Sequence, residues 1–303
     1  MKNKRKPILV SGSHRSGSTW LGRMIGLSDQ TGYIHEPFHR KYGISGKLFA
    51  KWFTYICDEN EQQYKQAIDR YLKFKYPILN KIKEANTLQD YGRAVRDFAI
   101  FSQYRLNRKR PLMKDPIAIY SAEWLHQTFD MDVIILIRHP AAFVGSIKKA
   151  EWRTSMNNFL EQPLLMRDYL QEFESQIIEH ANNPKDYIEE GILLWNMIHR
   201  IICTYEEKHD DWFFIRHEDL SREPIQKFGE IYNFLNLNYT ESIQDKILNY
   251  SSEQEEPGKL KRDSQSNIWS WKNRLSDQEI DRVYEGTQKV SSKYYSDEDW
   301  RIV

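Results

Sequence analysis

Short apolar segments that end abruptly in polar or charged residues recur along the chain and predict buried strands. The first begins at Pro7, is rich in branched side chains and is closed by Gly12. Apolar runs of this length are typical of parallel strands that are covered on both faces. The segments with this pattern are Pro7 to Ser11, Tyr33 to His35, Pro111 to Lys114, Val133 to Ile137 and Trp212 to Ile215.

Apolar residues at helical spacing lie between these segments. We expect helices near Ser18 to Leu27 and Gly191 to Tyr205, and Ser276 to Glu279 has the form of a capping box at a helix start. Residues 41–109 show no clear strand but carry many aromatic and basic residues at helical intervals, which predicts a helical insertion. The alternation of strands and helices predicts an α/β fold in one domain over residues 1–303, with a mainly parallel sheet flanked by helices.

The overall charge gives no global attraction to nucleic acid or to an anionic membrane, because 44 lysine and arginine residues face 43 aspartate and glutamate residues. Any anion-binding site must therefore be local. Cys57 and Cys203 fit neither a zinc spacing nor a disulfide framework, which favours a reducing compartment.

The apolar run from Ile8 to Val10 is too short for a signal sequence, which needs about 7 apolar residues, or for a membrane span of about 20. We therefore expect a cytoplasmic protein without a transmembrane segment. A truncated lumenal domain of a membrane enzyme would show the same pattern.

A loop between the first strand and the first helix carries the clearest chemistry. Its residues are Gly12-Ser13-His14-Arg15-Ser16-Gly17-Ser18-Thr19. A strand-to-helix loop of this kind directs backbone amides and a helix N-terminus toward a phosphate. The spacing is that of the nucleotide-binding P-loop, G-x-x-x-x-G-K-[ST]. Glycine also shapes many turns that bind no ligand. The residues around the loop must therefore show whether it binds a phosphate.

Two positions depart from the pattern of a magnesium-dependent nucleotide triphosphatase. Ser18 stands where the lysine would be, and Arg15 is the cation of the loop. The strand Val133 to Ile137, which would offer an aspartate to the magnesium shell, is followed by Arg138 instead. Arginine presents a planar fork that binds two oxygens of a phosphate or a sulfate. These changes predict a site for an anion without a metal.

The run from Arg15 to Trp20 resembles the 5′-phosphosulfate loop of the sulfotransferases that use 3′-phosphoadenosine 5′-phosphosulfate (PAPS). Arg15 stands where cytosolic members usually have lysine and carbohydrate-type members have arginine. The resemblance implies that the 5′-phosphate is held by the loop amides and by Ser16, Gly17, Ser18 and Thr19. It also implies that Trp20 stacks on adenine, although a tryptophan packed in the core would have the same helical spacing.

A second signature of this family is an arginine after a strand, followed eight residues later by a serine, and Arg138 with Ser146 matches it. The resemblance implies that both bind the 3′-phosphate. Further similarity lies in Arg216 to Leu220 and in Lys261 to Lys272, so it covers most of the chain except residues 41–109, where family members vary and acceptors bind. The implied reaction moves a sulfuryl group from PAPS to an acceptor hydroxyl and leaves 3′,5′-ADP, with no metal required.

Sulfuryl transfer requires in-line attack, neutralisation of the phosphate leaving group and removal of the hydroxyl proton. We expect Arg15 to neutralise the leaving group, with His14 either as a helper or as a histidine bonded to the loop backbone. Glu36 is the first candidate for the base, because it follows the second strand and precedes a proline, as in carbohydrate-type members. His35 and His39 are the alternatives, since imidazole titrates near neutral pH.

Lys114 and Asp115 follow another apolar segment, where they would orient the acceptor or the sulfuryl oxygens, or pair with each other. Five residues fall at or just beyond the ends of predicted strands, namely Gly12, Glu36, Lys114, Arg138 and His217. In a parallel sheet these ends share one edge, which is where such sheets build their sites.

Two other classes of protein stay open. A P-loop kinase with a deviant loop would need Mg-ATP, and the missing lysine and aspartate argue against it. A non-catalytic nucleotide-binding module would recognise a partner, and the candidates for all three catalytic roles argue against that reading. The arginine of the loop and the glutamate before proline favour a carbohydrate or glycolipid hydroxyl as acceptor, by likeness alone. The expected partners are thus a nucleotide donor and a hydroxyl acceptor, without nucleic acid.

Overall fold

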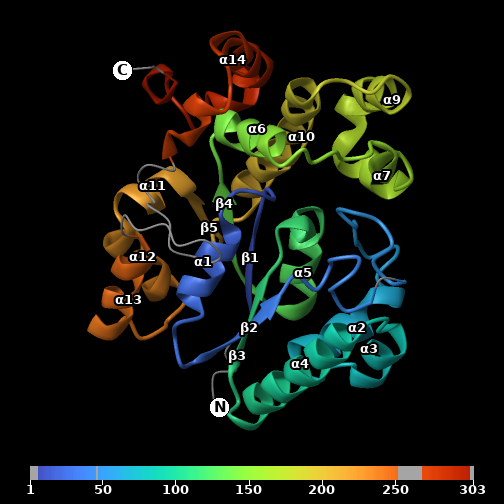
Figure 1. Ribbon diagram of the computed structural model, residues 1–303, viewed down its shortest axis with the longest axis vertical. Helices are drawn as coiled ribbons and strands as arrows, with labels where there is room; N and C mark the ends of the chain where they lie inside the picture. The colour runs from blue at the N-terminus through green and yellow to red at the C-terminus, as the bar shows by residue number, and fades with distance from the viewer. Residues whose placement is uncertain (1–5, 46, 252–267, 301–303) are drawn as a thin grey trace. The chain divides into compact units, whose positions relative to one another are not determined.

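Five strands form one sheet in the computed structural model, which describes residues 6–45, 47–251 and 268–300. Along the sheet the order is β2-β3-β1-β4-β5 (Figure 1). The strands are β1 (Ile8–Gly12), β2 (Thr31–His35), β3 (Arg110–Lys114), β4 (Asp132–Ile137) and β5 (Phe213–Arg216). The register pairs Lys114 with both Val10 and His35, and Ile137 with Arg216, in parallel. The predicted α/β fold with a parallel sheet is confirmed.

The apolar runs became central strands because both of their faces are covered. Ile8, Leu9 and Val10 of β1 are fully buried, as are Val133 to Leu136 of β4. A strand buried on both faces has no solvent side, so its sequence shows no alternation of apolar and polar residues. Several predicted boundaries shift slightly; the first helix, for example, ends at Ile25, and the last strand begins after Trp212.

The chain divides into two compact units, and the first contains Leu21–Val133 together with the residues of β1 up to Ser11. The predicted helical insertion is present in this unit as three consecutive helices from residue 62 onward (Figure 1), whereas the described residues of 41–61 form turns and bends. Its helices are α1 (Ser18–Ile25, from Leu21 on), α2 (Gln62–Leu72), α3 (Ile78–Glu84), α4 (Leu88–Leu106), η1 (Pro116–Ser121) and α5 (Ala122–Phe129). Within the insertion the aromatic rings of Tyr71 and Phe101 pack at 4.9 Å between centroids, which joins α2 to α4.

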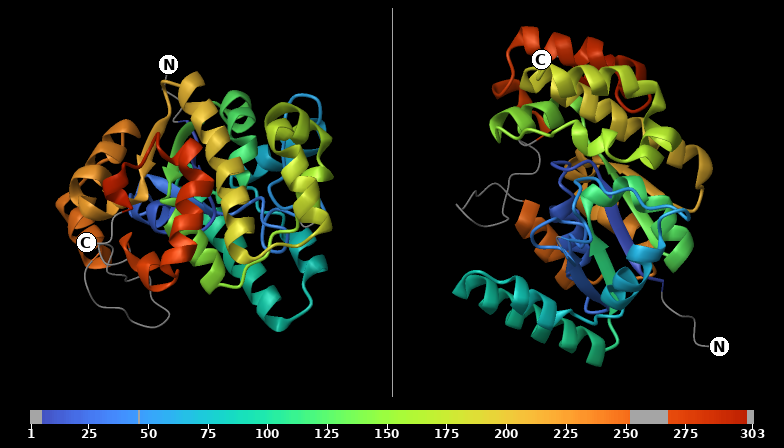
Figure 2. Two further views of the ribbon diagram at one scale, coloured as in Figure 1. Left: turned by 90° about the horizontal axis from the view of Figure 1, so that it is seen from above. Right: turned by 90° about the vertical axis from the view of Figure 1, so that its right-hand side faces the viewer.

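The second unit contains Gly12–Trp20 and the chain from Ile134 onward. Three of its helices, α6, α10 and α14, pack against one another (Figure 2). The capping box predicted at Ser276 begins α14, with the Glu279 amide donating to the serine hydroxyl. The helices are α6 (Pro140–Lys149), α7 (Asn157–Leu160), α8 (Pro163–Leu165), α9 (Glu174–Asn182), α10 (Tyr187–Lys208), α11 (His217–Arg222), α12 (Pro224–Phe234), α13 (Glu241–Ser251) and α14 (Asp277–Ser291).

Among the described residues, no helix combines the length and the apolar character that a membrane crossing requires. The single domain expected over residues 1–303 stays a prediction. Of the segment Lys261 to Lys272, residues 261–267 lie outside the described residues.

Candidate active site

The loop of the second unit is shaped by two glycines that no other residue could replace without strain. Gly12 has φ +139° and Gly17 has φ +97°, a region that side chains with a Cβ rarely occupy. A Cβ on Gly12 would lie 2.3 Å from the Leu136 carbonyl oxygen, and a Cβ on Gly17 would lie 2.6 Å from His217 Nδ1. The loop therefore lies directly against β4 on one side and against the His217 ring on the other.

The loop offers two kinds of hydrogen-bond donor, namely serine hydroxyls and the backbone amides at the start of α1. Ser18 is the first residue of α1, whose first amides have no partner inside the helix. Ser13 Oγ and Ser16 Oγ are buried and have no hydrogen-bond partner among the described residues. Buried hydroxyls without a partner are costly, and phosphate oxygens beside them would accept their protons. The loop thus suits the 5′-phosphate that its sequence predicts, and the roles of these residues stay predictions.

Arg15 and Ser146, which the sequence assigns to different phosphates, are in direct contact. Arg15 has φ +63° and an exposed side chain, and its Nε donates to Ser146 Oγ on α6 at 2.9 Å. A solvent-facing guanidinium held by a serine can move between that serine and an anion. Arg15 of the loop and Ser146 of the arginine–serine signature therefore lie side by side in this unit.

Arg138 forms the floor beneath the loop. Its side chain is 9% exposed, its Nη1 donates to the Ser16 carbonyl oxygen at 3.4 Å, and its Nε lies 3.5 Å from Glu218 Oε1. Its own carbonyl oxygen accepts from Trp195 Nε1 at 2.9 Å. A buried guanidinium is tolerated when a nearby carboxylate neutralises its charge. Arg138 is therefore fixed in place next to the loop backbone.

Glu218 is a residue whose importance the sequence did not reveal. Besides Arg138, its carboxylate accepts from the His139 amide at 3.2 Å and from the Tyr295 hydroxyl at 2.9 Å. Burial, followed by the negative charge of Glu218, raises the pKa of Tyr295, so this hydroxyl keeps its proton and donates it. A signal was present in the run Arg216-His217-Glu218 after a strand, but nothing local connects it to Arg138.

His14 and Trp20 lie among aromatic side chains. The His14 ring meets Phe143 and Trp152 edge-on, at 5.0 and 4.5 Å between centroids. Burial and the charge of Arg15 lower the pKa of His14 to about 3, so the ring is neutral. Trp20 is half-buried and lies edge-on to His217 at 5.8 Å and to Phe228 at 5.4 Å. Catalytic assistance by His14 and stacking of Trp20 on adenine both stay predictions.

In the first unit, Glu36 and Lys114 form an ion pair at the carboxyl ends of β2 and β3. The Lys114 ammonium donates to Glu36 Oε1, and the Glu36 amide donates to the Lys114 carbonyl oxygen at 2.8 Å. Lys114 is fully buried, whereas Glu36 is 22% exposed and has φ +43°. Burial raises the pKa of Glu36, but the attraction and the hydrogen bond of Lys114, together with smaller effects of His35 and His39, bring it below its usual range. Lys114 thus pairs with Glu36 rather than with Asp115.

The two histidines beside Glu36 differ in their hydrogen bonds. His39 Nδ1 accepts from the amides of Lys41 and Tyr42, both at 3.1 Å. Because Nδ1 is an acceptor and burial lowers the pKa of His39, the neutral ring carries its proton on Nε2. Desolvation together with the charge of Lys114 lowers the pKa of His35 to about 4. His39 is therefore arranged as a donor, and Glu36 and His35 as acceptors.

Asp115 holds the turn that follows Glu36. One carboxylate oxygen accepts from the Phe38 amide at 2.7 Å, and the other accepts from the Ile117 amide at 3.2 Å and so begins η1. Its side chain is fully buried. Burial raises the pKa of the Asp115 carboxyl to about 7, with a further contribution from the negative charge of Glu36. Asp115 fixes the backbone on which the candidate base lies.

The strand-end residues are brought together within each unit as the sequence predicts. Glu36 and Lys114 follow adjacent parallel strands of the first unit. Arg138 and His217 follow the adjacent strands β4 and β5 of the second, where Ile137 and Arg216 are paired. The prediction of a common edge is confirmed for both pairs.

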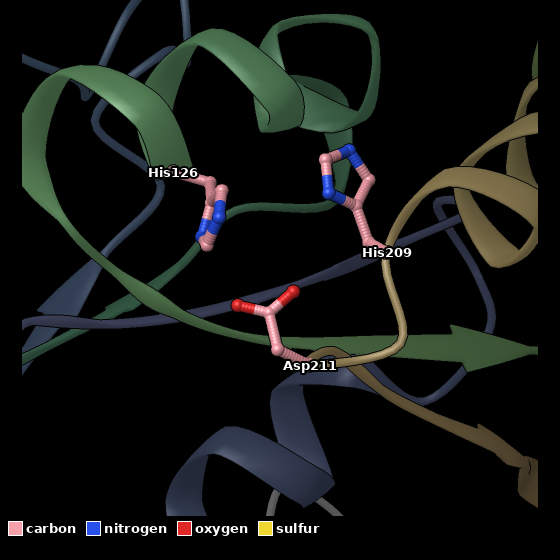
Figure 3. A group of neighbouring side chains, drawn as sticks. All are labelled: His126, His209 and Asp211. Carbon is pink, nitrogen blue, oxygen red and sulfur yellow. The ribbon is translucent and has the colours of Figure 1, made fainter.

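Three side chains of types that also bind metals, His126, His209 and Asp211, are drawn in Figure 3. His126 belongs to the first unit, where its Nδ1 lies 2.8 Å from the Met131 carbonyl oxygen. His209 belongs to the second unit with Asp211, and its ring stacks on Trp212 at 4.2 Å between centroids. Each histidine ring is thus oriented within its own unit, and we derive no metal site from them.

Replacing Gly17 with alanine should destabilise the protein by roughly 1–3 kcal/mol, because the new methyl group meets His217 and the positive φ becomes strained. Gly92→Ala is the matched control, since a Cβ there meets nothing within 4 Å. Alanine in that helix should stabilise by up to about 1 kcal/mol. Denaturant titration measures both free energies of unfolding, and equal values for the two variants would contradict this account of the loop.

Asp115→Asn should alter how stability depends on pH. The carboxyl has a pKa of about 7 in the folded protein and about 3.9 in an unfolded chain, so between these values only the unfolded state releases the proton. The free energy of unfolding therefore falls as pH rises from about 4 to 7, by at most about 1.4 kcal/mol per pH unit. The variant lacks this contribution, so its stability relative to wild type should rise over this range. Asp58→Asn, at an exposed aspartate, controls for the substitution itself. Parallel curves for Asp115→Asn and wild type would argue against the raised pKa.

A model of the sulfotransferase family matches residues 7–241. No curated protein matches the chain.

Among solved structures, the sulfotransferase domain of the olefin synthase of Synechococcus PCC 7002 is 14% identical, covers 97% of both chains and has a TM-score of 0.48. The sulfotransferase domain from the curacin biosynthetic pathway is 16% identical over 96% of this chain and 98% of that one, with a TM-score of 0.46. A mouse sulfotransferase complexed with PAP is 12% identical over 98% and 86%, with a TM-score of 0.43.

These TM-scores lie below 0.5, so membership of the family rests on the match over residues 7–241, which is well over half of the chain. The chain therefore belongs to the sulfotransferase family and is an enzyme that takes sulfuryl groups from PAPS.

Proposed function

We propose that this enzyme transfers the sulfuryl group of PAPS to a carbohydrate or glycolipid hydroxyl without the help of a metal ion. The observation that carries the proposal is the surface built by Arg15, Ser146 and Arg138 around a loop with unpartnered buried hydroxyls. Arginines and hydroxyls bind phosphate oxygens directly, and the loop has neither the lysine nor the strand-end aspartate of a magnesium site.

Each group of this surface receives a role in donor binding. The loop amides with Ser16, Gly17, Ser18 and Thr19 bind the 5′-phosphate, and Arg138 with Ser146 binds the 3′-phosphate. Trp20 stacks on adenine through the part of its half-buried ring that His217 and Phe228 leave free. His14, neutral and enclosed by aromatic rings, supports the loop from beneath.

In the reaction, the acceptor oxygen attacks sulfur as the bond from sulfur to the bridging phosphate oxygen breaks. A sulfate ester and 3′,5′-ADP are formed, and the acceptor hydroxyl gives up its proton. Arg15 stabilises the negative charge that gathers on the leaving phosphate. Its guanidinium, which is exposed and donates to Ser146, is the cation of the loop that can turn toward that charge.

Glu36 is the proposed base that takes the proton. Its carboxylate is ionised at neutral pH because Lys114 holds its pKa below the usual range, and it is partly exposed, so an acceptor can reach it. Lys114 orients the carboxylate, and Asp115 fixes the turn behind it. His35 is the second candidate, and His39 the third, because its Nδ1 already accepts two amide protons.

The carbohydrate acceptor rests on two observations of unequal weight. The sequence of the loop and the glutamate before Pro37 resemble those of carbohydrate-type members. In the first unit, moreover, the rings of Tyr42 and Trp52 contact His39, whose amide donates to the Glu36 carbonyl oxygen. Aromatic side chains beside a catalytic group are a common surface for binding the apolar face of a sugar ring.

Titration calorimetry should show binding of 3′,5′-ADP in the presence of a chelator, and no preference for Mg-ATP. Ser146→Ala and Arg138→Ala should each weaken this binding, the arginine variant by about tenfold to a hundredfold, as expected for a charged hydrogen bond of about 1.5–3 kcal/mol. Arg138→Ala also leaves Glu218 without its cation, and for that reason Ser146→Ala is the decisive variant. Arg200→Ala, at an exposed arginine of α10, is the matched control. Tighter binding of Mg-ATP than of 3′,5′-ADP would refute the donor site.

Glu36→Gln should keep donor binding but lose a factor of about 10²–10⁴ in kcat, the contribution typical of a general base. The assay follows radioactive sulfate from PAPS onto oligosaccharides, a glycolipid and a simple phenol. Transfer to the phenol alone would exclude a carbohydrate acceptor. An unchanged kcat in Glu36→Gln, with a loss in His35→Gln, would move the base to His35.

A further inference from the structure

Helix α4 of the first unit exposes an apolar stripe. Its side chains are Leu88, Tyr91, Val95, Phe98 and Leu106, with exposed fractions of 91%, 42%, 58%, 44% and 82%. Their spacing of three, four, three and eight residues places them on one face of a helix with 3.6 residues per turn. The buried residues of α4 are Ala94 and Phe101, on the adjoining face. This helix therefore buries Phe101 but leaves most of its large apolar side chains exposed.

Two further large apolar side chains are exposed on the helix next to α4. Leu79 and Ile82 of α3, which packs against α4, are 72% and 37% exposed. Soluble proteins rarely leave apolar residues in such continuous patches unless a partner covers them. The apolar stripe is thus a binding surface whose occupant must be identified from its chemistry.

The charge around the stripe selects the occupant. Residues 62–109 contain 11 lysine and arginine residues and only 4 aspartate and glutamate residues, a net charge of +7, whereas the whole chain carries +1. Two of those acidic residues are already used on α4, where Asp90 caps the helix and pairs with Arg93, and Asp97 pairs with Arg96. Exposed Lys83 and Arg105 lie on α3 and in the last turn of α4. The segment is strongly basic although the protein as a whole is nearly neutral.

We propose that the apolar stripe binds the surface of an anionic lipid bilayer, with α4 lying in the plane of the headgroups. An amphipathic helix with exposed leucines, a tyrosine and flanking basic residues has the composition of such interfacial helices. A second copy of the chain is a poor occupant, because it would bring another +7 segment against the first. This inference is independent of the acceptor and of the residues proposed for catalysis.

Co-sedimentation of the full-length protein with lipid vesicles tests the proposal. Binding is expected to vesicles of phosphatidylcholine mixed with phosphatidylserine, to be weak on phosphatidylcholine alone, and to fall as salt is raised. Each basic side chain near an anionic bilayer strengthens binding about fivefold, so Lys83→Gln with Arg105→Gln should weaken it about 25-fold. Arg200→Gln with Lys208→Gln, at two exposed residues of α10, is the matched control and should change it little.

The apolar contribution is tested by the triple variant Leu88→Gln, Val95→Gln and Leu106→Gln. All three positions are exposed, so the variant should fold, and a thermal melt verifies this. It should lose at least about tenfold in binding to the mixed vesicles. Leu248→Gln, at a 50% exposed leucine of α13, is the control and should bind like wild type.

Three results would overturn the proposal. The first is a wild-type protein that does not sediment with the mixed vesicles at low salt. The second is a triple variant that binds them as wild type does, which would place lipid binding elsewhere. The third is a dimer in sedimentation velocity without lipid that disappears in the triple variant, which would show that a second copy covers the stripe.

Discussion

The buried guanidinium of Arg138 is the interaction on which the second unit's site depends. Removing a charge from water is tolerated only when a partner charge and hydrogen bonds replace the solvent, and breaking such a pair typically costs about 3–5 kcal/mol. Glu218 supplies the charge, the Ser16 carbonyl oxygen accepts from the guanidinium, and Trp195 holds the backbone of Arg138 by donating to its carbonyl oxygen. Arg138 cannot move without losing these interactions. It therefore holds the loop backbone, through the Ser16 carbonyl, in the conformation that the positive φ angles of Gly12 and Gly17 allow. The loop is thus prepared for an anion by its surroundings as much as by its own residues.

The first unit repeats this scheme with one difference that bears on function. Lys114 is as deeply buried as Arg138 and is likewise neutralised by a glutamate. Glu218, however, is 4% exposed and its oxygens are engaged by a backbone amide and a tyrosine, whereas Glu36 is 22% exposed. A carboxylate that is fully enclosed can only support its cation, but one at the surface can also meet a substrate. Exposure therefore separates the structural glutamate from the proposed base.

The small net charge of the whole chain hides a strongly basic segment. The near-neutral chain contains a helical insertion with a net charge of +7 and an outward apolar stripe. The aromatic residues of the same insertion have a second use, since Tyr71 and Phe101 form its interior. One segment thus combines an ordinary core with a surface that is unusual for a protein surrounded by water.

The sequence by itself determined the strands, the phosphate loop and the capping box, because each depends on residues that are close along the chain. Continuous apolar runs indicate strands that are buried on both faces. Gly12 and Gly17 indicate backbone conformations that other residues rarely adopt. The strand ends also followed, since the direction of parallel strands fixes where they end.

Only the tertiary structure decided which groups meet. Lys114 could have paired with its neighbour Asp115, but it pairs with Glu36, 78 residues away, and Arg15 reaches Ser146 across 131 residues. Glu218 gained its role in the same way, and His39 became a donor only because two amides point at its Nδ1. The stripe on α4 was likewise undecided, because an amphipathic pattern shows that a helix has two faces but not which of them the fold covers. The physical reason is that backbone conformation is set by local sterics, whereas ion pairs, exposure and protonation are set by side chains that the fold brings from distant parts of the chain.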